Sequence, residues 1–328
     1  MRRRTALLTT AASLLALALA AAHAQPTWPT QPVKIVVPTG AGSSLDLIVR
    51  LMSDKLAARW GQTVLVDNKA GAGGLLGMDT VAKAVDGHTL GIGFNGPLAY
   101  APFLYAKLPY DPARDLKAIV MTTSQANVLA INADKVPAKN IAEFVAWAKA
   151  QGGKMNYSSL GQGSSAHLTM ALFLHEAGLA AVHVPFNGSP PAAFALAQGT
   201  VDASFMVAPA LLAHVQAGKV RMIAISASAS AKPDSLKDLP SLAEAGYPQV
   251  EALAWNGLVG PASISDAAVA RINADVNELL AKDSALRDAM ARNGLTIVGG
   301  SAAEFRRFIN ADVARWGPVI TRLGIRLN

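Results

Sequence analysis

Short apolar runs alternate with longer segments of helical periodicity from residue 34 onward. The apolar run 34–37 predicts a buried strand, and the segment 43–60 carries its apolar residues on one stripe, as an amphipathic helix does. A strand over 63–66, a helix over about 75–85 and a strand over about 88–94 are expected next. This alternation of strands and helices predicts an α/β fold with a parallel sheet covered by helices.

A long β-like stretch at 118–131 has a polar centre, Thr122 to Asn127. A strand that crosses between two lobes would have this pattern, so we expect one hinge strand near 122–127 and a second near 224–232. After the crossing the alternation restarts. The predicted strands cover 154–159, 182–186, 201–207 and 220–226, and the predicted helices cover 141–150, 164–177, 190–198 and 209–217.

The C-terminal part holds three expected helices, near 265–282, 284–292 and 302–322. A small, polar segment at 227–240 connects them to the preceding elements. The chain of 328 residues is long enough for about two domains. The predicted organisation is two lobes, the second inserted into the first: residues 25–123 and 231–328 form lobe 1, and residues 124–230 form lobe 2.

The first 24 residues have the pattern of a secretory signal peptide. Arg2, Arg3 and Arg4 precede an apolar run over 7–22, and Ala22-His23-Ala24 is a small-x-small cleavage site. The strongly apolar part is shorter than the roughly 20 residues that a spanning helix needs. We therefore expect cleavage after Ala24, no stable membrane insertion and a periplasmic location. The adjacent arginines leave twin-arginine export open.

Charge and cysteine content exclude several function classes. The leader holds three of the 29 Lys and Arg residues and none of the 22 Asp and Glu residues, which leaves the rest of the chain near +4. No dense basic run with interleaved aromatic residues occurs, so no nucleic-acid partner is expected. The absence of cysteine excludes disulfides, thiolate metal sites, cysteine nucleophiles and lipid attachment at a cysteine.

Two loops of glycine and serine each join a predicted strand to a predicted helix, at 38–46 and 156–168. With Ser43 as the N-cap of the first helix, Asp46 lies at the third helical position, where a capping-box acid would lie. In the second loop Ser164 or Ser165 would cap the helix. Such loops expose backbone N–H groups at the positive end of a helix, which favours an anion, although an ordinary turn has the same residues.

Two such loops in opposed lobes could hold one carboxylate, or the two ends of a short dicarboxylate, across a cleft. Neither loop contains Lys or Arg, so neutral donors would do the binding. His167, in the first turn of its helix, is either a local hydrogen-bond partner or a ligand contact. The residues expected at the ligand are Thr39, Gly40, Ala41, Gly42, Ser43, Ser44, Asp46, Asn95, Gly96, Gly161, Gln162, Gly163, Ser164, Ser165, His167, Phe186, Asn187 and Met206.

Other motifs fail for lack of context. The G-x-G-x-x-G pattern at 91–96 lacks the uninterrupted helix that a dinucleotide site requires. No G-x-S-x-G elbow occurs, and the six histidines show no paired metal spacing. We expect neither a cofactor nor a metal, and Trp255-Asn256-Gly257 is interpreted as packing ahead of another apolar strand.

Many short segments, in one order over 26–328, resemble the Bug-type, TctC-like solute receptors of tripartite tricarboxylate transport systems. The segments that carry the resemblance include Trp28-Pro29, 66–74, 108–112, 156–159, 161–165 followed by His167-Leu168, 183–186, 217–219, 243–246 and 260–262. The resemblance implies a periplasmic binding protein, type II-like, with two lobes that are mixed sheets flanked by helices and joined by hinge strands. It also implies a monomer that closes on a small carboxylate-bearing solute and delivers it to inner-membrane transporter subunits.

The chain departs from this family at several positions of the expected site. Thr39 replaces an aromatic residue, Ala41 a proline, Ser43 a glycine and Leu45 a threonine. Ala166 lies where glutamine is common, and Met206 lies where an acid is often found. These departures alter the far end of the pocket, so the ligand's identity does not follow from the family. The two loops lead us to expect a mono- or dicarboxylate, aromatic acids included, and an amine-bearing ligand is less favoured if Met206 lines the pocket.

Two other functions stay open at this point. A receptor that feeds a membrane histidine kinase would have the same ligand site and a different partner. An exported enzyme acting on a small polar substrate would need a nucleophile with a base, or a metal cluster, and the sequence offers neither at a known spacing.

Overall fold

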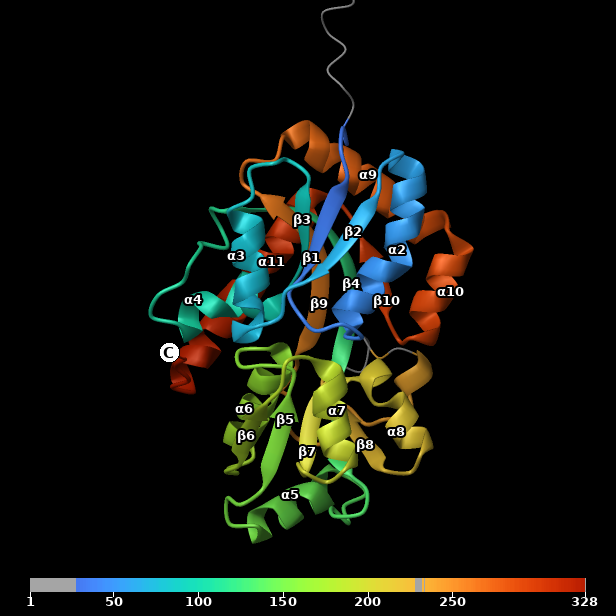
Figure 1. Ribbon diagram of the computed structural model, residues 1–328. Coiled ribbons are helices and arrows are strands. Elements are labelled where there is room, and N and C mark those ends of the chain that lie inside the picture. Colours follow the sequence, from blue (N-terminus) through green and yellow to red (C-terminus); the bar gives the residue numbers. More distant parts are fainter. Residues whose placement is uncertain (1–27, 228–231, 233, 328) are drawn as a thin grey trace, which may run out of the picture.

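The computed structural model describes residues 28–227, 232 and 234–327 of the chain. These residues form two α/β lobes, one above the other in Figure 1, with long strands running between them. The expected signal peptide, 1–24, lies outside the described residues. Within the described ranges, no helix combines the length and the apolar character that crossing a bilayer requires.

The sheet of the first lobe has the order β2-β1-β3-β9-β4, with β10 also paired to β4. Its strands are β1 (Val33–Val37), β2 (Val64–Asn68), β3 (Thr89–Phe94), β4 (Leu116–Asn132), β9 (Leu253–Pro261) and β10 (Thr296–Gly299). The first three strands are parallel, as the alternation of elements predicts. The strands β9 and β10 pair antiparallel and make the sheet mixed, and β10 is an element that the sequence analysis did not predict.

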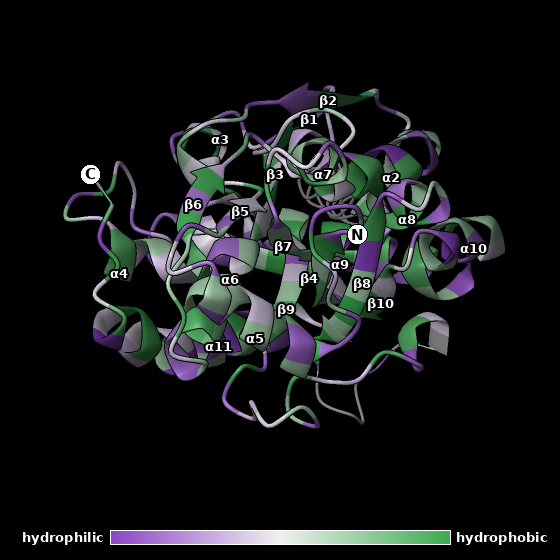
Figure 2. Cartoon of the chain, turned by 90° about the horizontal axis from the view of Figure 1, so that it is seen from below, coloured by the Kyte–Doolittle hydropathy of each residue, from purple (hydrophilic) through white to green (hydrophobic). Residues whose placement is uncertain are grey.

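Helices cover both faces of this sheet, which is why β1 is apolar at nearly every position. Ile35 of β1 faces a core shared with α2 and α9, whereas its neighbour Val36 faces the core on the other side. The helices of this lobe are α2 (Ser44–Trp60), α3 (Leu75–Ala82), α4 (Ala101–Leu104), α9 (Asp266–Lys282), α10 (Ser284–Arg292) and α11 (Ala302–Arg322). Figure 2 shows β4 and β9 near the centre of the view and α10, which carries hydrophilic residues, at its margin.

The second lobe has the strand order β4-β7-β5-β6, with β8 also paired to β4. Its remaining strands are β5 (Asn156–Ser159), β6 (Val182–Pro185), β7 (Ala203–Val207) and β8 (Val220–Ile225), and its helices are α5 (Ile141–Ala150), α6 (Ser165–Glu176), α7 (Ser189–Ala197) and α8 (Leu212–Gln216). Each of these elements overlaps the range that the sequence predicts for it.

The strand β4 belongs to both lobes, as its polar centre suggested. Its residues 116–126 pair with β9, and its residues 127–132 pair with β7 and β8. The second crossing differs from the expected position near 224–232. Ile225 forms a bridge with Ser241, and Ala252 donates its N–H to the carbonyl of Ser226, so the chain returns beside the second lobe until β9 begins. The second crossing strand is therefore β9, which the connection 227–240 precedes rather than contains.

Candidate functional site

The first glycine-serine loop ends in the N-cap of α2. Ser43 has extended backbone angles, and its Oγ accepts the N–H of Asp46 at 3.3 Å. The carboxylate of Asp46 in turn accepts the N–H of Gly42 at 2.9 Å and is held by Arg50 at 3.0 Å. Burial raises the pKa of Asp46, but the hydrogen bonds from Arg50, Gly42 and Asn68 outweigh it, so the net shift is downward. The buried acid stays ionised and clamps the loop onto its helix.

The second loop has the same construction at the start of α6. The Oγ of Ser164 accepts the N–H of His167 at 3.3 Å and donates to the carbonyl of Gly161 at 2.7 Å. In place of a carboxylate, Nδ1 of His167 accepts the N–H of Gly163 at 3.1 Å. The ring of His167 stacks on that of His183, with 4.0 Å between their centroids. His167 therefore holds the loop in shape with both its ring nitrogen and its backbone N–H.

The two stacked histidines are neutral. Burial lowers the pKa of His167 to about 3, with a further contribution from the neighbouring His183, and burial lowers the pKa of His183 to about 4. A neutral imidazole is what the loop needs, because Nδ1 of His167 can accept the N–H of Gly163 only while it carries no proton.

The first residues of both helices line one small chamber of about 30 Å³. Ser44 and Leu45 of α2 contribute to it from one lobe, and Ser165 and Ala166 of α6 from the other. The backbone N–H groups at the first two positions of a helix have no partner within the helix, and the caps use only the third. Two positive helix ends therefore meet at one chamber, which has room for about two water-sized groups.

Four neutral amide side chains complete the polar lining: Asn95, Gln125, Asn127 and Asn256. The rest of the lining comes from Phe94, Leu160, Val207 and Ala254, so among the described residues no charged side chain lines the chamber. Asn95 is fully engaged, because its Nδ2 donates to the hydroxyl of Tyr100 and its Oδ1 accepts the N–H of Trp255. An anion in the chamber would therefore be bound by neutral donors, namely the N–H groups of the two helix starts and Nε2 of Gln125.

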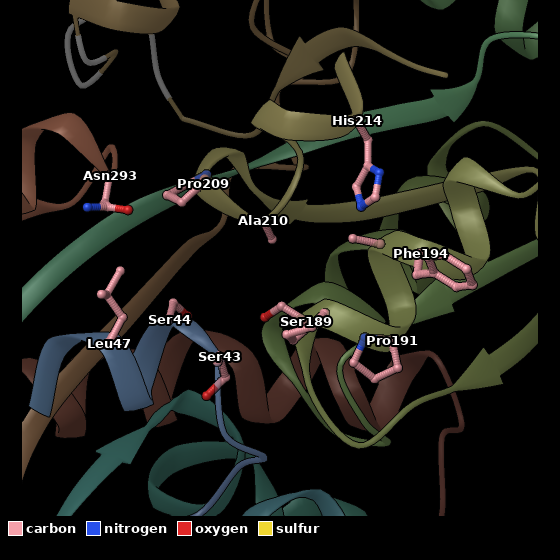
Figure 3. Close-up of a pocket in the computed structure, with 13 residues that line it drawn as sticks. Ser43, Ser44, Leu47, Ser189, Pro191, Phe194, Pro209, Ala210, His214 and Asn293 are labelled. Atoms are coloured by element: carbon pink, nitrogen blue, oxygen red, sulfur yellow. The ribbon is translucent and has the colours of Figure 1, made fainter. Parts of the chain in front are cut away.

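A larger groove of about 580 Å³ adjoins the chamber, and Ser44 lines both. Figure 3 shows Ser43, Ser44 and Leu47 on the helix of the first lobe, opposite Ser189, Pro191 and Phe194 on α7. Pro209, Ala210, His214 and Asn293 lie around the remaining side. The groove is open between the lobes and is lined largely by apolar atoms.

The lobes contact each other closely around the chamber. A Cβ added at Gly40 would lie 3.1 Å from the carbonyl oxygen of Asn187, and one added at Gly96 would lie 3.0 Å from that of Gly163. In both pairs the first residue belongs to lobe 1 and the second to lobe 2. The absence of a side chain at these glycines lets the two backbones approach, so the lobes are closed around the chamber, while the groove beside it is open.

The structure distributes the predicted site residues over several places. Ser44, Asn95 and Ser165 line the chamber, while Ser43, Asp46, Ser164 and His167 hold the two loops in shape. Thr39, Gly161, Phe186 and Asn187 line a neighbouring cavity of about 20 Å³, and Gly40, Gly42, Gly96 and Gly163 lie at or near the interlobe contacts. Ala41 and Gln162 are exposed and line neither cavity.

Met206 lies elsewhere. It is fully buried in a core with Val128 and Ala130, and the next residue, Val207, lines the chamber instead. Successive residues of a strand point to opposite faces, so only one of the two can face the ligand. The expectation that Met206 replaces an acid in the pocket is corrected accordingly, and the argument against an amine-bearing ligand cannot rest on it.

Sequence reasoning missed Gln125, Asn127 and Asn256. The first two belong to the polar centre of 118–131, which was interpreted only as a crossing strand. Asn256 was interpreted as packing; its neighbour Trp255 is buried, whereas Asn256 lines the chamber. Polar residues within otherwise apolar strands were the available signal.

A metal site has no support in the described part of the chain, where no group of three or more His, Asp or Glu side chains could hold an ion.

The fold and the site define a solute-binding protein. Two lobes are joined by crossing strands, and a chamber lies between two helix ends that come from opposite lobes.

Comparison with known proteins agrees with this class. A model described as the tripartite tricarboxylate transporter family receptor matches residues 48–325. BugT from Bordetella pertussis is 33% identical over 311 residues, 94% of each chain. Among solved structures, Rpa4515 of R. palustris with adipate has a TM-score of 0.86 and 30% identity, covering 92% of this chain and 100% of that one. MatC from Rhodopseudomonas palustris with bound malate has a TM-score of 0.83 and 29% identity, covering 89% and 100%. The chain belongs to the tripartite tricarboxylate transporter family of receptors.

Proposed function

We propose that this receptor captures a small organic acid in the chamber between its lobes and delivers it to inner-membrane transporter subunits. The observation that carries the proposal is the meeting of two helix starts, Ser44–Leu45 and Ser165–Ala166, at one chamber without a charged side chain. Two related structures are named with bound acids, Rpa4515 with adipate and MatC with malate, which supports an acid as the class of ligand.

The neutral donors are sufficient for useful affinity. Each hydrogen bond to a charged group contributes roughly 1.5–3 kcal/mol. A few such bonds, less the cost of closing the lobes, reach about −8 kcal/mol, which corresponds to micromolar binding. A lysine or arginine in the chamber is not required for this.

The carboxylate and the rest of the ligand would occupy different spaces. The chamber of about 30 Å³ suits the acid group, while the adjoining groove of about 580 Å³ has the size of an ordinary small-molecule pocket. In this arrangement the carbon skeleton passes Ser44 on its way from the chamber to the groove.

Capture requires the lobes to open and close. We place the hinge in β4 and β9, the two strands that run between the lobes. The proposed boundary of lobe 2 then moves from 230 to 252, and lobe 1 consists of the residues before 124 and after 252. The ligand shifts the population toward the closed form only if it binds that form more tightly.

The proposal includes export and a single-chain receptor. The signal pattern at 1–24 and the relationship to periplasmic receptors such as BugD support release into the periplasm. We include in the proposal that the receptor is a monomer and acts without catalysis. Delivery to a membrane transporter follows the family's description.

A screen of acids by thermal shift tests the proposal. Ligand at 100 times Kd adds about 2.7 kcal/mol to the free energy of unfolding, a readily measured shift in Tm. Calorimetry should show that the best acid binds and that its methyl ester does not, since the ester lacks the negative charge that the helix ends favour.

A pair of variants locates the site. Ala166→Leu fills the chamber and should abolish binding, whereas Ala171→Leu, on the same helix away from the chamber, should preserve it. Equal binding by both variants, or by acid and ester, would contradict the proposed site.

A further inference from the structure

We propose that the ligand carries a hydroxyl group beside its carboxylate, and that Gln125 and Asn127 of β4 bind this hydroxyl. The inference rests on the proposed function and names its substrate class more narrowly, as hydroxy acids. It follows from buried hydrogen-bonding atoms in the chamber that have no partner in the described structure.

Gln125 is 5% exposed and lines the chamber. Within the described residues, neither its Oε1 nor its Nε2 has a hydrogen-bond partner. Exchanging the two atoms by rotating the amide changes nothing, because one donor and one acceptor remain unsatisfied in either orientation. Buried amides are nearly always paired, so this side chain indicates a ligand with both kinds of group.

Asn127 is 1% exposed and presents an acceptor. Its Nδ2 donates to Oγ of Ser165 at 2.6 Å and to Oγ1 of Thr169 at 3.1 Å. The hydroxyl of Thr169 donates its own proton to the carbonyl of Ser165 at 2.7 Å, so it must accept from Asn127. This fixes the orientation of the Asn127 amide and leaves Oδ1, which has no partner among the described residues.

The chamber thus offers more than a carboxylate can use. A carboxylate accepts from the helix N–H groups and from Nε2 of Gln125, but it has no proton for Oε1 of Gln125 or Oδ1 of Asn127. A donor on the ligand is needed for these oxygens. Leaving a buried acceptor unsatisfied carries the full cost of removing it from water.

A hydroxyl fits this requirement better than an ammonium group. None of the residues that line the chamber is Asp or Glu, so a buried ammonium would lack a counter-charge. A hydroxyl donates to one amide oxygen and accepts from Nε2 without adding charge. Its one proton pairs one of the two amide oxygens, so a hydroxy acid satisfies a buried acceptor that its deoxy partner leaves unpaired.

Matched pairs of acids test the inference by calorimetry on the mature protein. The pairs are lactate and propionate, malate and succinate, 3-hydroxybutyrate and butyrate, and mandelate and phenylacetate. In the pair that binds best, the hydroxy acid should bind at least about 10-fold more tightly than its deoxy partner, because the deoxy acid leaves a buried acceptor unpaired.

Gln125→Leu removes the amide and should bring this ratio close to one, chiefly by weakening the hydroxy acid. Gln198→Leu makes the same exchange at an exposed position after α7 and should preserve the ratio. If Gln125→Leu does not fold, the ratio for the unmodified protein decides by itself.

The two proposals fail differently. If a deoxy acid binds as tightly as its hydroxy partner, water satisfies the two amide oxygens and the present inference is overturned, while the acid receptor stands. If no acid of any pair binds, the proposed function falls together with it.

Discussion

The two loops that begin α2 and α6 are built alike and differ in one group. Ser43 and Ser164 cap their helices with the same 3.3 Å hydrogen bond to the third helical residue. That third residue then accepts the N–H of a glycine in the loop, through a carboxylate in Asp46 and through a neutral imidazole in His167. The comparison shows that one geometry can be held by an ionised group or by a neutral one.

The difference lies in what surrounds each clamp. Asp46 has the guanidinium of Arg50 beside it, which stabilises its charge, whereas buried His167 stacks on His183, which in turn stacks on Tyr157, and a charge there would be desolvated. The two loops should therefore respond differently to acid, although they present similar N–H groups to the same chamber.

The largest expected effect on ligand affinity comes from adding a side chain to the second loop, at Gly163. Gly163 has φ +71°, and a Cβ there would lie 2.7 Å from Cδ1 of Leu104, a buried residue of the opposite lobe. Gly163→Val should therefore hinder lobe closure and weaken ligand binding by about 100-fold, roughly 2.7 kcal/mol. Calorimetry with the best acid measures this.

The control for this variant is Gly178→Val in the same lobe. Gly178 has φ +61° and no atom within 4 Å of an added Cβ, so it suffers the backbone strain without the collision. Both variants should lose stability, but only Gly163→Val should lose affinity. Equal affinities would mean that the contact between Gly163 and Leu104 is irrelevant to binding.

The second prediction separates the two clamps by pH. The unfolded chain takes up a proton at each histidine below about pH 6.5, whereas the folded protein resists protonation of His167 and His183 down to about 3 and about 4. The unfolded state thus binds more protons, and the free energy of unfolding falls as the pH drops from 6.5 to 4.5. The slope is about 1.4 kcal/mol per pH unit for each histidine.

Urea unfolding at pH 7, 6 and 5 measures this slope for the unmodified protein and for His167→Asn. The variant should show a smaller slope, since one titrating group is gone. The Asp46 clamp contributes none in this window, because its pKa is shifted downward from 3.8. Identical slopes would indicate that His167 titrates normally and is not held neutral by the fold.

The smallest expected effect concerns the caps themselves. Ser43→Ala and Ser164→Ala each remove one cap and should each lower the free energy of unfolding by about 1 kcal/mol. Denaturant titrations at pH 7 compare them. Each variant also removes one hydrogen bond within its loop, from Ser43 to Thr39 or from Ser164 to Gly161. Clearly different losses of free energy of unfolding would therefore mean that the two loops are not equivalent in stability.

The local sequence pattern predicted most of the helices and strands, because the residues that begin, end and orient each element lie within a few positions of it. The cap at Ser43 and the stop at Gly61 delimit α2, and the polar centre of β4 marked a strand between lobes. The site was only partly predictable. The two loops were found, but the lining of the chamber depends on which face of a strand a residue occupies, and Met206 was chosen where Val207 lies.

The sequence alone determined the alternation of strands and helices, the two capped loops and the absence of cationic residues from them, because these depend on neighbouring residues. The tertiary structure decided that β9 returns along β4 and brings Asn256 opposite Thr123, beside Gln125. It also decided that both helix starts face one chamber. More than a hundred residues separate these partners along the chain, so only the packing of the two lobes brings them together.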